Sequence, residues 1–199
     1  MSSTSYFVYG SLVNPRARHK PLAAVPAVLR GWVRQWKHCI DSSSGKVCAL
    51  TAGKKPGAEI LGVVLMDDQA DLGALDAREV GYRRIEVSVS IKNLVNGYEE
   101  KECFFYVSSP ECYRSGNEEY PIWRSYLDCV LAGYWDLGGT VAVEEFCRST
   151  EGWEVPILDD RCSPLYPRSI GLEKYQQAAI DDILAARGIL ARLTSLDLR

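Results

Sequence analysis

The stretch Tyr6-Phe7-Val8-Tyr9-Gly10-Ser11-Leu12 decides how this chain folds and where its chemistry lies. Four large apolar residues in succession predict a buried strand, which stops at a glycine followed by a hydroxyl residue. Glycine has no Cβ, so the chain can turn sharply there and expose its amide N–H groups. Amides arranged in this way suit a carboxylate or a developing oxyanion.

A second stretch, Leu75-Asp76-Ala77-Arg78-Glu79-Val80-Gly81-Tyr82-Arg83, ends a short helical pattern and leads into a strand. It places a single glutamate, Glu79, at the junction of the two elements. A carboxylate in this position can hang over a pocket. Exposed glutamates are common, however, so the pattern alone also fits a solvated surface residue.

Hydrophobic periodicity predicts the elements around these two stretches. Apolar or alternating runs predict six strands, over residues 6–9, 28–40, 47–51, 60–66, 85–91 and 102–107. Helical spacing predicts helices over 67–79, 123–134, 141–149 and 172–183. We therefore expect an α+β fold, in which about six strands form a small mixed β-barrel and helices pack outside it.

Glycine and asparagine supply the boundary signals. Gly31 is expected to form a β-bulge, Gly53–Gly57 a turn between two strands, and Asn96-Gly97 a hairpin turn. Asp67-Asp68 is expected to cap the first helix, and Gly138-Gly139 to end the second.

Length and composition favour an ordinary globular protein. The 199 residues, 47% hydrophobic and 25% charged, are expected to form a single domain over 1–199, with a helical, proline-containing C-terminal extension from about residue 135. A net charge of −3 argues against nucleic acid as the partner. No apolar run approaches the ~20 residues that cross a membrane, and no signal peptide is evident, so we expect a cytoplasmic protein.

The seven cysteines suggest neither a metal site nor a disulfide framework, because their number is odd and no Cys-x-x-Cys pair occurs. A nucleophilic cysteine needs a histidine partner, and the chain has only His19 and His38. Cys39 directly follows His38, so in a strand the two side chains point to opposite faces. A thiol-dependent hydrolase is therefore a weak hypothesis.

Taken in order, the two stretches resemble the γ-glutamylcyclotransferase superfamily, including its AIG2-like and ChaC-like relatives. Tyr9-Gly10-Ser11-Leu12 is similar to the family's loop after the first strand, and Leu75-Asp76-x-x-Glu79 followed by Tyr82 is similar to its later element. The run Gly57–Leu65 resembles a family strand as well. The resemblance covers roughly the first 135 residues and implies a mixed α/β barrel with a pocket at one end of its strands.

The resemblance implies an enzyme that cyclises a γ-glutamyl amide or isopeptide. The substrate's own α-amine attacks its γ-carbonyl, 5-oxoproline forms, and an amine or amino acid departs. Such a reaction needs a small-molecule γ-glutamyl substrate but neither a metal nor an organic cofactor. Glu79 is implied as the general acid and base.

The resemblance also implies a set of substrate-binding residues. Amides of the first loop would hold the substrate's α-carboxylate or its carbonyl oxygen, and two tyrosines would line the pocket and hydrogen-bond the substrate or the glutamate. These residues are Tyr9, Gly10, Ser11, Leu12, Tyr106 and Tyr126.

Some positions of this sequence depart from the family pattern or are compatible with more than one interpretation. Relatives often carry glycine directly after the glutamate, where this chain has Val80. Leu12, where other members carry asparagine, points towards the glutathione-acting or the γ-glutamylamine branches without choosing between them. The segment Trp153–Arg161 is expected to close over the pocket. A homodimer is compatible with the sequence, and so is a non-catalytic protein of the same fold that binds a small carboxylate.

Overall fold

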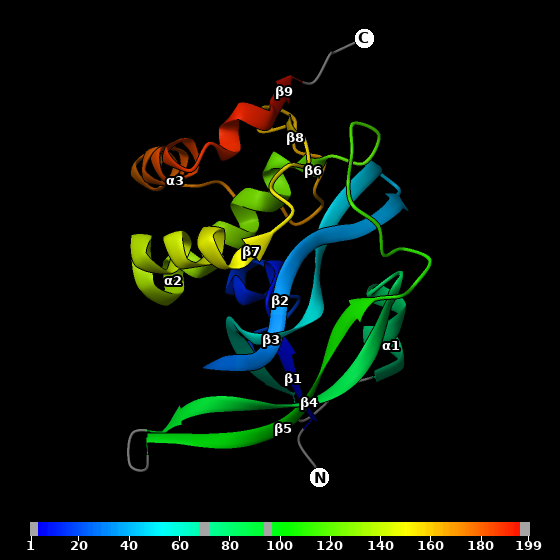
Figure 1. Cartoon of the computed structure of the whole chain (residues 1–199), viewed down its shortest axis with the longest axis vertical. Coiled ribbons are helices and arrows are strands. Elements are labelled where there is room, and N and C mark those ends of the chain that lie inside the picture. The colour runs from blue at the N-terminus through cyan, green and yellow to red at the C-terminus, as the bar shows by residue number, and fades with distance from the viewer. Residues whose placement is uncertain (1–3, 68–71, 94–96, 196–199) are drawn as a thin grey trace.

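A closed, five-stranded β-barrel forms the first half of the molecule (Figure 1). The structure is a computed structural model that describes residues 4–67, 72–93 and 97–195. The barrel strands are β1 (Thr4–Val8), β2 (Ala23–Ser42), β3 (Gly45–Asp67), β4 (Tyr82–Asn93) and β5 (Gly97–Ser108). They pair in the order β3-β1-β5-β4-β2, and β2 also pairs with β3, which closes the ring.

The barrel is mixed because β1 and β5 run parallel, whereas its other neighbouring strands are antiparallel. The predicted α+β class and barrel architecture are therefore confirmed. The Asn96-Gly97 turn expected between β4 and β5 begins at a residue outside the described ranges.

One predicted boundary is wrong. Residues 47–51 and 60–66, expected as separate strands, belong to the single 23-residue strand β3, so no chain-reversing turn forms over Gly53–Gly57. β2, with 20 residues, runs alongside it for almost its whole length. The turn-forming residues of Gly53–Gly57 instead lie where the pairing of β3 with β2 is interrupted.

That interruption lies opposite Gly31. Arg30 pairs with Glu59, while Trp32 pairs with Lys54, so β3 carries extra residues that have no partner in β2. Gly31 has a φ of +80°, a conformation that side chains other than glycine rarely adopt. The bulge predicted at Gly31 is thus confirmed, and it bends the two strands around the barrel.

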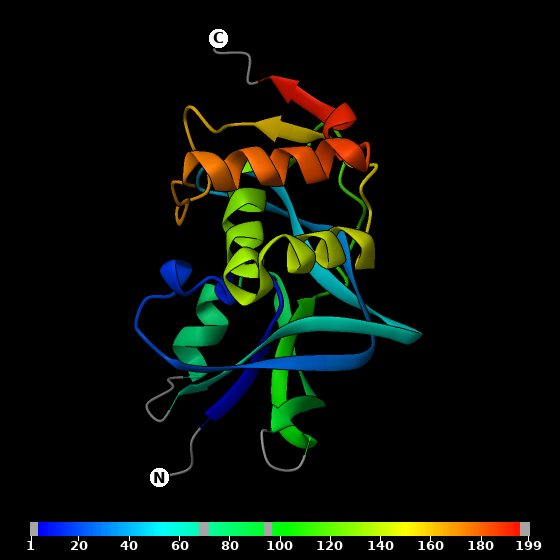
Figure 2. The same cartoon turned by 90° about the vertical axis from the view of Figure 1, so that its left-hand side faces the viewer.

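Helices cover the barrel and extend the molecule beyond it. Figure 1 shows α2 and α3 above the barrel and α1 against its side, and Figure 2 shows α3 lying across α2. The helices are α1 (Leu72–Arg78), α2 (Arg124–Ser149) and α3 (Lys174–Ala186), with 3₁₀ turns η1 (Ser11–Val13), η2 (Pro15–Ala17) and η3 (Ile189–Arg192). Among the described residues, no helix is long and apolar enough to cross a membrane.

The sequence predicted helix boundaries at Gly138-Gly139 and at Asp67-Asp68, and the two can be compared with the structure. Gly138 and Gly139 have non-helical backbone angles and divide α2 into two pieces, where the glycine pair was expected to end one helix and precede another. At the first helix, Asp67, one of the two expected capping residues, belongs to the end of β3, and the described part of α1 is Leu72–Arg78. Asp68, the other expected capping residue, lies outside the described residues.

Four short strands complete the sheets. β7 (Thr150–Glu151) adds to the barrel beside β2. β6 (Ile122–Trp123), β8 (Ile157–Asp159) and β9 (Leu193–Ser195) form a separate parallel sheet. The C-terminal extension is therefore attached to the barrel through its own small sheet as well as through its helices.

Asn14 fastens the loop that follows β1 to α2. It is fully buried, and its amide nitrogen donates to the Cys129 carbonyl at 3.0 Å. Gly133 in α2 permits this approach, because a Cβ there would lie 2.6 Å from the Asn14 nitrogen. The start of the loop is consequently held against the helix.

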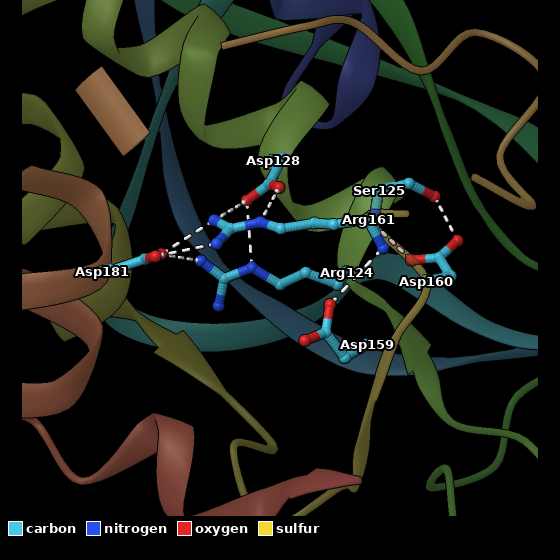
Figure 3. A network of polar contacts seen from close by, with 7 residues as sticks. All are labelled: Arg124, Ser125, Asp128, Asp159, Asp160, Arg161 and Asp181. Atoms are coloured by element: carbon cyan, nitrogen blue, oxygen red, sulfur yellow. Dashed lines mark hydrogen bonds and ion pairs between the residues drawn. The ribbon is translucent and has the colours of Figure 1, made fainter. Parts of the chain in front are cut away.

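An ionic network fastens the extension to α2 (Figure 3). Asp128 in α2 accepts hydrogen bonds from Arg124 Nε at 3.0 Å and from Arg161 Nε at 2.6 Å. Both arginines also bind Asp181 in α3. The side chains of Arg124 and Asp128 are 2% and 7% exposed, so their charges are compensated inside the protein rather than by water.

Asp128→Asn is expected to lower the free energy of unfolding by about 3 kcal/mol, because it leaves one buried and one partly buried guanidinium group with a single carboxylate. Urea unfolding followed by tryptophan fluorescence measures this change. Glu145→Gln, which breaks the exposed pair with Arg148, is the matched control and should cost less than about 1 kcal/mol. Equal effects of the two substitutions would contradict the structural role of the network.

Candidate active site

A cavity of about 460 Å³ opens at the end of the barrel where β1 ends and β4 begins. Several parts of the chain line it: β1 and the loop after it, the β2–β3 hairpin, the junction of α1 and β4, Tyr106 of β5, the start of α2, and residues 166–168. The residues predicted from sequence all lie on its wall: Tyr9, Gly10, Ser11, Leu12, Glu79, Tyr106 and Tyr126.

A tight turn between α1 and β4 positions Glu79. The Glu79 amide donates to the Leu75 carbonyl at 3.1 Å, and the Tyr82 amide donates to the Glu79 carbonyl at 3.0 Å. Gly81 makes the turn possible, since its φ is +74° and a Cβ there would lie 2.7 Å from Cys112 Sγ. Glycine thus stands two residues after the glutamate and serves the turn that holds it.

Burial determines the electrostatics of Glu79, whose side chain is 19% exposed. Burial raises the pKa of its carboxyl above the ordinary value, and the positive charges of Arg78 and Arg168 oppose this rise in part. Arg78 Nε lies 3.6 Å from the carboxylate. A carboxyl with a raised pKa can accept and return a proton near neutral pH.

The loop after β1, whose residues Gly10, Ser11 and Leu12 line the same cavity, begins with a 3₁₀ turn. η1 begins at Ser11, and its first hydrogen bonds run from the Val13 amide to the Gly10 carbonyl and from the Asn14 amide to the Ser11 carbonyl. The Ser11 and Leu12 amides therefore have no acceptor within the turn, and no side chain caps it. They belong to the group of amides, around Gly10, Ser11 and Leu12, that the sequence predicts as donors to a substrate.

Tyr9 and Tyr106 form a connected pair in the wall. Tyr9 Oη donates to the Tyr106 carbonyl at 2.7 Å, and Tyr106 Oη donates to Asp76 Oδ1 at 2.7 Å. The Tyr106 hydroxyl is therefore engaged by the carboxylate of α1 and not by Glu79. Its contact ties α1 to β5, which fixes the helix that precedes the glutamate.

Tyr126 covers the glycine of the loop. Its Oη accepts a long hydrogen bond of 3.5 Å from the Leu50 amide, and a Cβ on Gly10 would lie 3.3 Å from the same oxygen. Burial raises the pKa of the Tyr126 hydroxyl, which is therefore a neutral donor or acceptor in the cavity.

Comparison with known proteins identifies the family. Residues 6–129, more than half of the chain, match the family model described as "Gamma-glutamyl cyclotransferase, AIG2-like". The chain belongs to this family. No curated protein sequence matches it significantly.

Two solved structures resemble most of the chain. One is named "Gamma-glutamyl cyclotransferase", with 22% identity and a TM-score of 0.60, over 91% of this chain and 99% of that one. The other is the uncharacterized human protein loc79017, with 21% identity, a TM-score of 0.60 and the same coverage. At these identities the likeness establishes the fold.

Within the part that matches the γ-glutamyl cyclotransferase family, the site predicted from sequence omitted His38, Arg78 and Tyr82, which also line the cavity. The His38 ring stacks on Tyr82 with 3.6 Å between centroids, and its Nδ1 lies 2.9 Å from Ser108 Oγ. Burial lowers the pKa of His38 to about 4, so the ring is neutral at pH 7. It packs beneath the turn that carries the glutamate.

Beyond the matched residues, the extension contributes Tyr166, Pro167 and Arg168 to the cavity. Tyr166 Oη donates to Ser11 Oγ at 2.8 Å, and Arg168 Nε donates to Tyr166 Oη at 3.0 Å. A hydrogen-bonded chain thus joins the extension to the loop after β1.

The segment Trp153–Arg161, expected to close over the pocket, lies elsewhere. Trp153 stacks edge-on against Trp36 and Phe146, and Arg161 belongs to the ionic network. None of these nine residues, all of them described, lines the cavity. Because the segment packs on α2 and β2, the part of the extension that reaches the site comes later in the chain.

The raised pKa of Glu79 predicts a pH-dependent stability. Between its unfolded and folded pKa values the folded chain binds more protons, so stability falls as the pH rises through that window. Glu79→Gln removes this fall and is expected to be more stable than the natural chain at pH 7 but not below about pH 4. Urea unfolding from pH 4 to pH 8 tests this, with the exposed Glu144→Gln as control. A Glu79→Gln variant that is less stable at pH 7 would refute the assigned environment.

Proposed function

We propose that this protein cyclises a γ-glutamyl amide or isopeptide to 5-oxoproline and releases an amine or amino acid. The observation that carries the proposal is the meeting, in one cavity, of a buried carboxyl with a raised pKa and a loop with unengaged amides. Membership of the γ-glutamyl cyclotransferase family supports the same reaction class.

Much of the proposed rate acceleration comes from holding the substrate's α-amine close to its γ-carbonyl carbon. The nucleophile and the carbonyl belong to the same substrate, so the protein must hold the chain folded with the two groups almost in contact. A well-oriented intramolecular attack can lower the activation free energy by on the order of 7–11 kcal/mol, because the translational and rotational freedom of the reacting groups is already restricted. A cavity of about 460 Å³ is within the usual size for small-molecule sites.

Glu79 is proposed to move the proton. As the substrate's α-amine forms its bond to the γ-carbonyl carbon, the carboxylate takes a proton from that nitrogen. The protonated carboxyl then gives a proton to the departing nitrogen as the original C–N bond breaks. No water is consumed, and the carboxylate is restored at the end of the cycle.

The loop after β1 is proposed to hold the negative charge. Its Ser11 and Leu12 amides would bind the substrate's α-carboxylate or the carbonyl oxygen as charge develops on it. Tyr126 above Gly10 would complete this wall. Tyr106 is proposed to act indirectly, by fixing α1 through Asp76.

Glu79→Gln is expected to lower kcat for 5-oxoproline formation by about 10²- to 10⁴-fold, because an amide cannot carry the proton. A panel of γ-glutamyl amino acids, γ-glutamyl amines and glutathione, assayed for 5-oxoproline, measures this change. Circular dichroism shows whether the variant is folded, and Glu144→Gln serves as the activity control.

Two outcomes would reject parts of this proposal. A folded Glu79→Gln variant that keeps most of its activity would remove the glutamate from the mechanism. If no compound of the panel yields 5-oxoproline but γ-glutamyl compounds raise the melting temperature, the chain is a non-catalytic carboxylate-binding protein of the same fold.

A further inference from the structure

Two arginines line the cavity together with two acids. Arg78 lies beside Glu79, and Arg168 comes from the extension. The other acid of the cavity wall, Asp41, accepts a hydrogen bond from Tyr120 Oη at 3.0 Å. Burial raises the pKa of the Glu79 carboxyl, and the positive charges of Arg78 and Arg168 oppose this rise.

Arg78 has donors to spare. Its Nε and Nη2 are buried and make no hydrogen bond with any residue that the structure describes, although Nε lies 3.6 Å from Glu79 Oε1, and its Nη1 lies 3.2 Å from His19 Nδ1. A buried N–H group without an acceptor is costly. A carboxylate brought to this guanidinium would offer an acceptor to these donors.

The guanidinium of Arg168 is positioned by a tyrosine and has no carboxylate partner among the described residues. Its Nε binds Tyr166 Oη, and no carboxylate of the described residues lies within ion-pair distance of its guanidinium. The positive charge of Arg168 adds to burial in lowering the pKa of Arg78, so the two side chains repel each other. An anion placed between them would relieve the repulsion and accept from both.

The position of Arg168 in the chain indicates which part of a substrate it meets. Residues 6–129 match the family model, and they contain Glu79 and the loop amides that would handle the γ-glutamyl group. Arg168 lies outside them, on the extension. The family model does not extend to Arg168, so a residue there can be suited to the group that differs between γ-glutamyl substrates, which is the departing amine.

We infer that Arg168, assisted by Arg78, binds a carboxylate on the departing group, so that the substrates are γ-glutamyl amino acids or peptides rather than amines without a carboxylate. This inference rests on the proposed function. It makes Arg168 a specificity-determining residue, since guanidinium groups bind carboxylates through charge-assisted hydrogen bonds.

The backbone around Arg168 supports this role. The Tyr166 amide donates to Ser125 Oγ at 3.2 Å, and the Leu165 amide donates to Asp160 Oδ2 at 2.8 Å. Asp160 is itself buried and also binds the Ser125 amide at 2.7 Å. The guanidinium is therefore presented by a segment that is fixed before a substrate arrives, which favours binding.

Paired substrates test the inference. γ-Glutamylglycine, γ-glutamylalanine and glutathione are each compared with the analogue whose C-terminal carboxylate is a carboxamide. The natural chain is expected to prefer the acids. Arg168→Gln should lower kcat/KM for the acids by about 10- to 100-fold and change it less than about threefold for the amides, since only the charge-assisted contact is lost.

Two further variants separate recognition from structure. Arg148→Gln, an exposed arginine of α2, should change neither substrate class. Tyr166→Phe removes the hydroxyl that holds Arg168 but keeps its charge, and should retain a preference for the acids.

The outcomes distinguish this inference from the proposed function. If Arg168→Gln lowers activity on acids and amides equally, or if the natural chain turns over both equally, the inference is overturned while the reaction stands. If no compound yields 5-oxoproline, γ-glutamyl amines included, the proposed function fails and the inference falls with it.

Discussion

Strand β1 closes the barrel, and the cavity depends on that closure. Although β1 has only five residues, it pairs with β3 along one edge and with β5 along the other. Its residues Tyr6–Val8 are buried, as expected for a strand enclosed on both sides. Because β1 and β5 run parallel, their carboxyl ends meet at the same end of the barrel. The loop at Gly10 and the side chain of Tyr106 therefore face one cavity.

The first turn of α2 is the second point on which the site depends. Ser125 binds Asp160 and the Tyr166 backbone, whereas its neighbour Tyr126 lines the cavity. The ionic network around Asp128 lies on the same helix and binds the extension further along. One helix thus holds both the barrel side and the extension side of the cavity, so the distance between them is set by well-packed, charge-compensated contacts.

The sequence predicted most of what depends on local pattern. Apolar alternation and the glycines located the barrel strands, and the family resemblance located Glu79 and the loop after β1. The continuity of strand β3 was not predicted, because residues 53–57 have the composition of a turn and it is the pairing of β3 with β2 that keeps them extended. Arg78 was within reach, as it stands beside Glu79. Arg168 had no local signal, since its place in the cavity is fixed by contacts between residues far apart in the chain.

The residues that form the cavity wall are far apart in the sequence, and this has a consequence for folding during biosynthesis. β1 is made first, but its partners β3 and β5 follow only after tens of residues, and the last cavity residue stands at position 168. During translation the first strand must therefore wait with both edges unpaired, a state prone to aggregation. A nascent chain that has been synthesised only as far as the barrel contains Glu79 and the loop amides but lacks the part of the cavity wall formed by residues 166–168.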